Sequence, residues 1–391
     1  MNNPIDKKAK ILRVTTVPMS LRFLLRGQMA YMRSKGFEVL MASANGPEVM
    51  EVMSHEGARH LAVALTRKIT PITDIKAIFQ LVRLIKKEKI DIVHSHTPKA
   101  GLIAMLAAKL ANAPHRLHTI AGIPWMERRG ATRKLLKLVD KVAYMAATKV
   151  YSNSYGLLDF VKSEELVKSS KLSIIGAGST NGIDVDYFKP KSVLKSKEEL
   201  RAEMELLSSD FIFCFVGRVV NDKGMTELAI AMKQMPKHVK LLLIGPFEDD
   251  LDPIASETKD FFETDPRVSV CGYQSDIRPY LKMSDALVFP SYREGFPNVP
   301  MQGGAMGLPI IATDINGCNE IVQNEVNGLL VEVKNAVELT NAMKKIYEDK
   351  DFYMHLSSRS RQMIIERFDQ KVVWEALYAE YIALAEKKPN V

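Results

Sequence analysis

Alternation of short strands with longer helices is the feature that most restricts how this chain can fold. Runs rich in Val, Ile and Leu alternate with stretches such as 21–35 and 75–89, whose apolar residues have helical spacing. This alternation is typical of a mainly parallel sheet with helices on both faces. In the first part of the chain we expect strands at 11–17, 37–42, 60–65, 90–95, 116–120, 149–152 and 172–175.

The pattern stops once and then begins again. Residues 176–190 are rich in Gly, Asn and Asp and predict a connecting segment. Beyond it we expect helices at 336–348 and 351–367, and a last helix near 371–388 that could pack on either domain. The second set of strands is expected at 211–216, 239–244, 267–270, 286–289 and 309–312.

We therefore predict an α/β protein of two doubly wound, Rossmann-like domains, which 391 residues are enough to build. The first domain spans 1–180, the linker 181–190 and the second domain 191–370, and the helix at 371–391 could pack back on the first. In such folds ligands bind outside the carboxyl ends of the strands. A ligand is therefore expected in a cleft between two facing domains.

The cysteines and the N-terminus favour a cytoplasmic protein. Cys214, Cys271 and Cys318 lie far apart and form no CxxC pair, so neither a disulfide framework nor a zinc cluster is expected. The first residues, MNNPIDKKAK, are polar and basic, and no run reaches the ~18 apolar residues of a spanning helix. A membrane could then be met only peripherally, at the inner face of the cytoplasmic membrane.

The charge is unevenly divided. Residues 1–190 carry 30 Lys and Arg against 15 Asp and Glu, whereas residues 191–391 carry 24 against 31. A basic half is consistent with nucleic acid, an anionic membrane surface or a phosphate-bearing substrate. No nucleic-acid-binding module, zinc ligand set or aromatic-interleaved basic strand accompanies it in the sequence, so no nucleic-acid partner is expected.

Two motif matches carry little weight. GAGSTNG at 176–182 has Asn181 at the third glycine position of GxGxxG and leads into the connecting segment, so dinucleotide binding is not expected there. His94 and His96 end an expected strand. We expect one of them in the core and the other at the cleft, without zinc.

The two DxD pairs do not predict a metal site. In some transferases this pattern holds a divalent cation on a diphosphate. Here Asp184 and Asp186 lie in the connecting segment, and Asp250 and Asp252 lie in an acidic loop. A structural role is the stronger expectation for both pairs, and we expect neither a metal nor a cofactor.

Residues 211–224, FIFCFVGRVVNDKG, combine a buried strand with two cations. The strand ends at Gly217, and Arg218 and Lys223 flank a turn that leads into a helical run from Met225. Cations at the carboxyl end of a strand, beside a helix N-terminus, suit a diphosphate. A solvated pair of surface cations is the alternative.

Residues 291–322 give the second signal. After the expected strand at 286–289, Glu294 opens a Gly-containing turn whose N–H groups can meet an anion, and a helix begins near Pro300. Gln302 lies eight positions after Glu294, so a loop carboxylate and a helix amide could face one ligand. A purely structural turn is the alternative.

Together these segments resemble the retaining, family 4 glycosyltransferases of GT-B fold, over nearly the whole chain. LLLIGP at 241–246 and VCGYQSDIRPYL at 270–281 fit the same pattern. The segments 91–124 and 181–190, the latter reading NGIDVDYFKP, are similar to the capsular and O-antigen polysaccharide branch. The resemblance implies a donor-binding C-terminal domain and an acceptor-binding N-terminal domain.

The resemblance also assigns roles to residues. Arg218 and Lys223 match the pair that neutralises the leaving nucleotide diphosphate. Glu294 matches the first Glu of the EX7E motif, which contacts hydroxyls of the donor sugar. Gly272 and Tyr273 match the segment that lines the nucleobase. The full set of positions that match nucleotide-sugar contacts is Gly217, Gly272, Tyr273, Gly295, Phe296, Asn298, Val299 and Gln302.

Two positions depart from the family pattern. The second glutamate of EX7E, which usually holds the ribose, is Gln302 here, an amide that accepts and donates but carries no charge. A His-Gly pair that often approaches the sugar is replaced by Ala121-Gly122.

The resemblance implies a metal-independent retaining enzyme, a hexosyl- or N-acetylhexosaminyltransferase of surface polysaccharide biosynthesis. Its donor would be a nucleotide-sugar, a UDP-sugar, and its acceptor a saccharide linked to polyprenyl diphosphate. A non-hydrolysing nucleotide-sugar epimerase of similar fold is one alternative. A non-catalytic nucleotide-sugar-binding protein is the other.

A membrane-anchored acceptor would explain the basic half. From Arg128 to Lys141, cations are interleaved with Leu and Val, as in an amphipathic helix on an anionic surface. An ordinary solvated helix face is the alternative. The candidate acceptor or membrane residues are Lys99, Arg128, Arg129, Arg133, Lys134 and Lys137.

Overall fold

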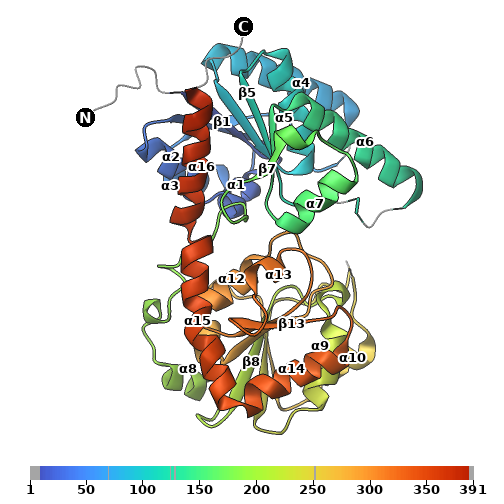
Figure 1. Ribbon diagram of the computed structural model, residues 1–391, viewed down its shortest axis with the longest axis vertical. Helices are drawn as coiled ribbons and strands as arrows, with labels where there is room; N and C mark the ends of the chain where they lie inside the picture. The colour runs from blue at the N-terminus through green and yellow to red at the C-terminus, as the bar shows by residue number, and fades with distance from the viewer. Residues whose placement is uncertain (1–8, 69, 124, 127–128, 251, 387–391) are drawn as a thin grey trace. The chain divides into compact units, whose positions relative to one another are not determined.

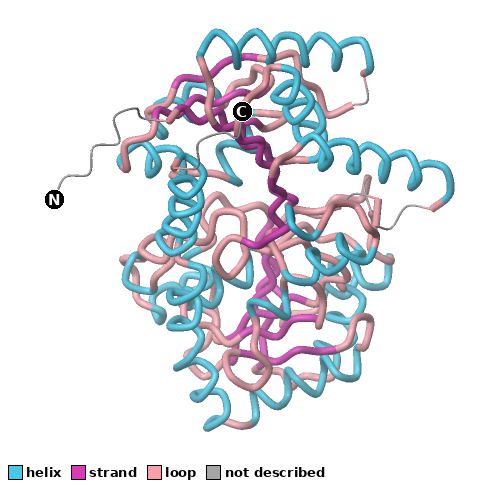
Figure 2. The backbone as a smooth tube through the Cα atoms, turned by 45° about the horizontal axis from the view of Figure 1, so that its top comes forward, coloured by secondary structure: helices cyan, strands magenta, loops and turns pink. Residues whose placement is uncertain are grey.

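A computed structural model describes residues 9–68, 70–123, 125–126, 129–250 and 252–386. The chain divides into unit 1, Met1–Asn181 with Lys371–Val391, and unit 2, Gly182–Gln370. Each unit is a parallel sheet covered by helices on both faces (Figures 1 and 2). The predicted class, α/β with two doubly wound units, is confirmed.

Unit 1 is built on β1 (Lys10–Val14), β2 (Glu38–Ser43), β3 (Arg59–Ala62), β4 (Ile92–His96), β5 (His115–Ile120), β6 (Lys149–Ser152) and β7 (Leu172–Ile174). Neighbouring strands pair in parallel in the order β3-β2-β1-β4-β5-β6-β7. The chain therefore reverses its direction across the sheet between β1 and β4. A short 3₁₀ turn, Ser169–Lys171, precedes β7.

A layer of helices covers each face of this sheet. One layer contains α4 (Pro71–Glu88), α5 (Pro98–Leu110), α6 (Gly130–Ala146) and α7 (Tyr155–Ser163). The other contains α1 (Pro18–Leu24), α2 (Gln28–Ser34), α3 (Val49–Glu56) and α16 (Gln370–Ala385).

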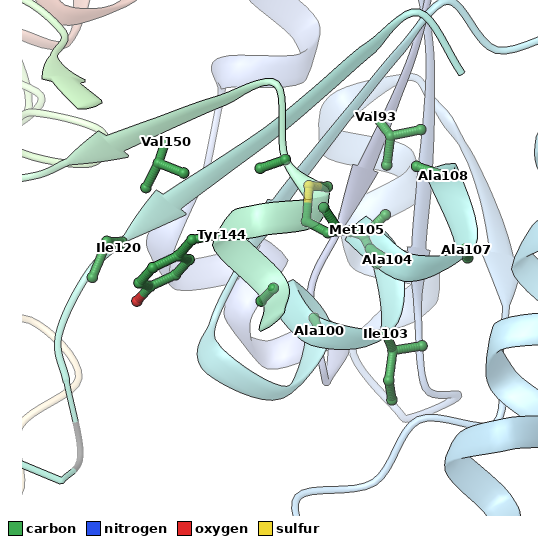
Figure 3. Close-up of a cluster of buried hydrophobic side chains, with 14 of the residues drawn as sticks. Val93, Ala100, Ile103, Ala104, Met105, Ala107, Ala108, Ile120, Tyr144 and Val150 are labelled. Atoms are coloured by element: carbon green, nitrogen blue, oxygen red, sulfur yellow. The ribbon is translucent and has the colours of Figure 1, made fainter. Parts of the chain in front are cut away.

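The core under the first layer centres on α5. This helix is rich in Ala, and small side chains let it lie close to the strands. Figure 3 shows Ala104 and Met105 of α5 gathered with Val93 of β4 and Tyr144 of α6, all of which are buried. Because α5 lies between α4 and α6, the outward faces of these two helices form the flanks of the layer.

A buried arginine joins four elements under the second layer. Arg13 of β1 is 1% exposed and donates to the Tyr381 hydroxyl of α16 and to the Gln28 amide oxygen of α2. Its guanidinium also lies 3.3 Å from Nδ1 of His94 and 2.7 Å from Nε2 of His96. This contact holds α16, whose place the sequence left open, within unit 1.

The two histidines of β4 share one environment. Residues two apart on a strand lie on the same face, and the rings of His94 and His96 stack 4.6 Å apart. Both are 1% exposed, which corrects the expectation that one would line a cleft. Burial, together with the charge of Arg13, holds the pKa of both imidazoles well below the ordinary value, so both are neutral and can accept hydrogen bonds from Arg13.

Unit 2 is built on β8 (Phe211–Val216), β9 (Val239–Ile244), β10 (Val268–Gly272), β11 (Ala286–Phe289), β12 (Ile310–Thr313) and β13 (Gly328–Val331). The parallel order is β10-β9-β8-β11-β12-β13, so the chain reverses between β8 and β11. The sequence analysis did not predict β13, because four apolar residues between turns give too short a signal. The unit's helices are α8 (Lys197–Glu203), α9 (Met225–Lys233), α10 (Ser256–Thr264), α11 (Arg278–Met283), α12 (Asn298–Ala305), α13 (Cys318–Ile321), α14 (Ala336–Glu348) and α15 (Lys350–Phe368), with 3₁₀ turns at Pro190–Ser192 and Asn221–Lys223.

Residues 182–190, which the composition suggested as a linker, pack within unit 2. Ile183 and Val185 are buried, and Arg361 of α15 donates to the Val185 carbonyl at 2.9 Å. The apolar residues spaced among Gly, Asn and Asp explain this packing.

Within the ranges that the structure describes, no helix is both long enough and apolar enough to cross a bilayer.

A buried carboxylate makes the stability of unit 1 depend on pH. Trp125 Nε1 donates to Asp140 of α6 at 2.7 Å, and burial raises the pKa of Asp140 to about 6. An acid whose pKa is raised by folding contributes full stability below its unfolded pKa and loses that contribution as the pH rises through its folded pKa. The cost of charging Asp140 therefore appears between about pH 4 and pH 6.

Asp140→Asn should raise the free energy of unfolding at neutral pH by up to ~3 kcal/mol, because the amide oxygen still accepts from Trp125 while no charge is buried. Urea unfolding at a series of pH values should show this gain growing from about pH 4 and levelling off near pH 7. A gain of equal size at every pH, or a loss at neutral pH, would contradict the burial of a charge as the cause.

Candidate functional site

The reversal of the chain in unit 2 brings two turns together at the carboxyl edge of its sheet. β8 and β11 are neighbours, and their connections leave toward opposite faces, which is where open α/β sheets bind ligands. The turn at 217–224 follows β8 and the turn at 290–297 follows β11. These turns carry the predicted catalytic residues Arg218, Lys223 and Glu294.

Two glycines let the connections approach each other closely. Gly224 has a φ of +71°, and a Cβ there would lie 2.1 Å from the carbonyl oxygen of Pro290 in the other turn. A Cβ on Gly245, just after β9, would lie 1.7 Å from the carbonyl oxygen of Gly217. The connections after β8, β9 and β11 are therefore in backbone contact.

Lys223 and Glu294 form the central contact of this edge. Their side chains are 15% and 16% exposed and make an ion pair across the two turns. Glu294 also accepts from Ser291 Oγ at 3.0 Å, and Lys223 Nζ lies 5.7 Å from the centre of the Phe289 ring. Opposite charges that are partly removed from water attract more strongly than exposed ones, so the pair fixes the two turns to each other.

Arg218 lies at the same edge and is half exposed. Its Nη1 donates to Glu248, in the connection after β9, at 3.0 Å. An exposed pair of this kind stabilises a fold by only about 0–1 kcal/mol. Arg218 is therefore held less firmly than Lys223.

Contacts with other parts of unit 2 hold the second turn, at 290–297, in place. The carbonyl of Gly295 accepts from Asn316 Nδ2 at 2.6 Å. The ring of Phe296 packs edge-on against Phe368, with 5.3 Å between centres. These contacts orient the backbone that leads into α12.

The N-terminus of α12 supplies further donors. Asn298 and Val299 are its first residues, so their N–H groups have no acceptor within the helix and the positive end of the helix dipole lies here. Gln302, one turn later, is half-buried. The side chain of Glu294 and this N-terminus belong to the same connection.

The predicted nucleobase residues follow β10. Gly272 has a φ of +62°, and its carbonyl accepts from the N–H of Gly245 at 2.8 Å, which links this connection to the one after β9. The side chain of Tyr273 is 76% exposed. It offers a free aromatic face to solvent.

The acidic loop after β9 supports the turn after β8. The N–H of Asp222 donates to the Asp252 carboxylate at 2.7 Å, and the N–H of Asn221 donates to the Asp252 carbonyl at 3.1 Å. Asp222 in turn accepts from Arg293 Nε at 3.0 Å. Asp252 of the second DxD pair thus stabilises the backbone of the turn after β8.

The first DxD pair also serves the backbone. Asp184 Oδ1 accepts from the N–H groups of Asp186 and Tyr187 at 3.0 and 2.9 Å, which closes a turn. Among the residues whose placement is described, no group of three or more His, Cys, Asp or Glu is arranged to hold a metal ion.

Lys99, a predicted acceptor residue, is bound inside unit 1. It is 17% exposed, pairs with Asp74 at 2.7 Å and donates to the hydroxyls of Thr66 and Thr70 at 2.8 and 3.1 Å. It fastens the loop before α4 and presents no free charge to an acceptor. Arg128, from the same predicted set, lies outside the described residues.

The cations of α6 fall into two groups. Arg133 and Lys137 pair with Glu164 at 2.7 and 2.6 Å, and the hydrogen bond from Lys137 is the main reason that the pKa of Glu164 is lowered. Lys134 and Lys141 are exposed, as is Arg129, which directly precedes the helix. Only the second group projects fully into solvent.

Three residues that the sequence analysis did not single out complete the edge of unit 2: Ser291, Asn316 and Glu248. Ser291 precedes Glu294 by three positions, a spacing that could have indicated a local hydrogen bond. Glu248 is 30 positions from Arg218, and no sequence pattern relates the two.

Two family models match the chain. The model described as "Glycosyl transferases group 1" matches residues 210–349, and the one described as "Glycosyl transferase 4-like" matches residues 16–154. The chain is 30% identical over 378 residues to the Staphylococcus aureus "Capsular polysaccharide biosynthesis glycosyltransferase CapM", covering 96% of this chain and 97% of the relative.

A second relative and a solved structure agree with this match. The Escherichia coli "UDP-Gal:alpha-D-GlcNAc-diphosphoundecaprenol alpha-1,3-galactosyltransferase" is 29% identical over 381 residues, covering 93% and 94% of the two chains. A glycosyltransferase from Rickettsia africae has a TM-score of 0.82 at 21% identity, over 98% of this chain and all of that one. This likeness shows the fold, two doubly wound units of GT-B type, as the sequence predicted.

Proposed function

The chain belongs to the group 1, or family 4, glycosyltransferases, and from this premise we propose its reaction and substrates. It transfers a sugar, with retention of configuration and without a metal, from a nucleotide-diphosphate donor, a UDP-sugar. The acceptor is a saccharide linked to polyprenyl diphosphate, and the product enters a surface polysaccharide. Unit 2 binds the donor and unit 1 the acceptor.

The observation that carries the proposal is the meeting of two cations and a helix N-terminus at one edge of unit 2. Arg218, Lys223 and the first N–H groups of α12 supply donors where β8 and β11 end. A diphosphate suits such donors, because guanidinium binds two oxygens at once and helix N-termini favour anions. Tyr273 and Gln302 are available for the base and the ribose.

Glycosyl transfer of this kind depends on the leaving group. As the bond between the sugar and the diphosphate breaks, positive charge develops on the sugar and negative charge on the phosphate oxygens. Donors fixed in place stabilise that negative charge without having to reorganise, and Lys223 is fixed by Glu294 before the donor arrives. The acceptor hydroxyl attacks from the face that the diphosphate leaves, so no protein nucleophile is required.

The two departures from the family pattern limit specific roles. Gln302 can hold the ribose through one accepted and one donated hydrogen bond. Position 121 is Ala, and the preceding histidine does not replace the missing imidazole, because His118 is 3% exposed and bonded to Ser95 Oγ at 2.9 Å. Orientation of the sugar then depends mainly on Glu294.

The relatives support the substrate classes. The E. coli relative is named for a UDP-Gal donor and a diphosphoundecaprenol-linked acceptor, and the S. aureus relative for capsular polysaccharide biosynthesis. Family membership also favours transfer over the epimerase and the non-catalytic alternatives.

The helices α4, α5 and α6 on one face of the sheet of unit 1 support binding to an anionic membrane surface. Within α4, α5 and α6 every carboxylate is engaged: Asp74 pairs with Lys99, Glu88 pairs with Arg59 at 2.7 Å, and Asp140 is buried. The helices α4, α5 and α6 therefore present no unpaired, exposed carboxylate that would repel anionic lipid.

The same helices expose large apolar side chains beside cations. Ile72 and Phe79 of α4 are 75% and 59% exposed, and Leu135 and Leu138 of α6 are 56% and 58% exposed. Apolar residues in this setting can enter the interface of a bilayer while the cations meet its headgroups. The exposed cations of the two helices are Lys76, Arg83, Lys86, Lys87, Lys134 and Lys141.

Arg218→Ala and Lys223→Ala should each lower kcat/KM for transfer roughly 30- to 1000-fold, or about 2–4 kcal/mol, because each removes a cationic donor from the leaving diphosphate. Lys233→Ala, which removes a half-exposed lysine of α9 paired with Glu257, is the matched control and should leave the rate unchanged. Full turnover in both site variants, with folding intact, would refute the diphosphate assignment.

Gln302→Ala should raise the KM for the donor more than it lowers kcat, because a ribose contact is shared by the ground state and the transition state. Gln302→Glu should be tolerated, since a carboxylate keeps the acceptor that the ribose needs. Steady-state kinetics at saturating acceptor separate the two constants. An unaltered donor KM in Gln302→Ala would exclude this residue from the nucleotide site.

Arg83→Glu with Lys141→Glu should weaken co-sedimentation with anionic liposomes by roughly 30-fold or more, since each cation near such a surface contributes about 1 kcal/mol. Transfer to a short soluble acceptor should persist. The matched control reverses two exposed cations of unit 2, Lys237→Glu with Lys350→Glu, and should bind as wild type does. The membrane assignment fails if wild-type protein ignores these liposomes at low salt, or if both double variants behave alike.

A further inference from the structure

Glu248 is bonded to the guanidinium of Arg218, which the proposed function assigns to the diphosphate of the donor. Its Oε2 accepts from Arg218 Nη1 at 3.0 Å, and the two side chains are 31% and 50% exposed. Carboxylate and phosphate oxygens bind a guanidinium through the same N–H groups. A diphosphate that uses this face of Arg218 must therefore displace Glu248.

Backbone contacts fix Glu248 beside the arginine. The N–H of Val219 donates to the carbonyl of Pro246 at 2.8 Å, and Val219 forms a parallel bridge with Phe247. In this parallel register Arg218 lies opposite Pro246 and Glu248 lies opposite Val220, so the two residues are diagonal neighbours at the carboxyl edge of the sheet. The pairing brings the two connections together, and the long side chains of Arg218 and Glu248 then meet across this offset.

The next carboxylate along the chain has a different partner. Asp249 Oδ2 accepts from Lys259 of α10 at 2.6 Å. Asp249 is thus neutralised outside the site, whereas the charge of Glu248 is directed to Arg218. The two adjacent acids form a natural pair of test and control positions.

We propose that Glu248 is an internal competitor of the diphosphate for Arg218. It holds the guanidinium in the empty enzyme, yields it when the donor binds and takes it back as the nucleoside diphosphate leaves. While the diphosphate is bound, the displaced carboxylate remains nearby and repels it, which weakens binding and speeds product release. This inference rests on the proposed function, which assigns Arg218 to the diphosphate.

Glu248→Gln should tighten UDP binding about three- to tenfold at low salt, because the amide keeps the size and an acceptor but not the charge. Titration calorimetry with UDP measures the affinity, and stopped-flow displacement should show dissociation slowed by a similar factor. The gain should shrink as salt rises, because the interaction lies near the surface. A merely structural role for Glu248 predicts the opposite sign, weaker binding.

Asp249→Asn is the matched control, and it should alter UDP affinity by less than about twofold, because its charge is already paired with Lys259. In an Arg218→Ala background Glu248→Gln should give a clearly smaller gain, since competition for the guanidinium requires both partners and only the repulsion remains. Unchanged or weaker UDP binding in Glu248→Gln alone would overturn the inference. If wild-type protein binds neither UDP nor other nucleoside diphosphates, the proposed function itself fails.

Discussion

The ion pair between Lys223 and Glu294 is the contact on which the proposed donor site depends. It joins the turns after β8 and β11, 71 positions apart in sequence, at a place where both side chains are largely withdrawn from solvent. A charge left there without its partner would cost several kcal/mol, so neither residue can be placed independently of the other. Gly224 lets the backbones of these two turns approach closely enough for the pair to form. In the proposed function the same lysine that anchors the turns also meets the diphosphate.

The sequence predicted the parts of this site that local patterns encode. The strand and the two cations of 211–224 and the glutamate turn after β11 are contiguous motifs, and strand-helix alternation predicted the sheets that carry them. The sequence analysis did not identify Glu248, because its contact with Arg218 depends on the pairing of the connections after β8 and β9, which no spacing along the chain reveals. Lys99 shows the converse limit, since a sequence shows a charge but not the Asp74 that neutralises it. The helix α16 belongs to unit 1 through Tyr381 and a buried arginine, a contact across most of the chain length.

The division of charge between the halves of the chain acquires a physical meaning in the structure. In unit 1 the carboxylates of α4 and α6 are bonded to partners within the unit, so cations and apolar side chains dominate the outward faces of these helices. In unit 2 the carboxylates beside the donor site either brace its backbone, as Asp252 does, or occupy its cations, as Glu248 does. In the proposed function the positive charge attracts the lipid-linked acceptor, and in the role that we infer for Glu248 the negative charge keeps the diphosphate from being held too tightly.

Sugar transfer itself is the most direct measurement of the proposed reaction. Purified protein would be incubated with a panel of UDP-sugars and a polyprenyl-diphosphate-linked saccharide in the presence of EDTA, and the lipid-linked products examined by mass spectrometry and NMR. We expect that one sugar is added with retained anomeric configuration, that UDP is released, and that both events require the acceptor. Epimerisation of the donor without an acceptor, or transfer that EDTA abolishes and Mn²⁺ restores, would contradict the proposed reaction.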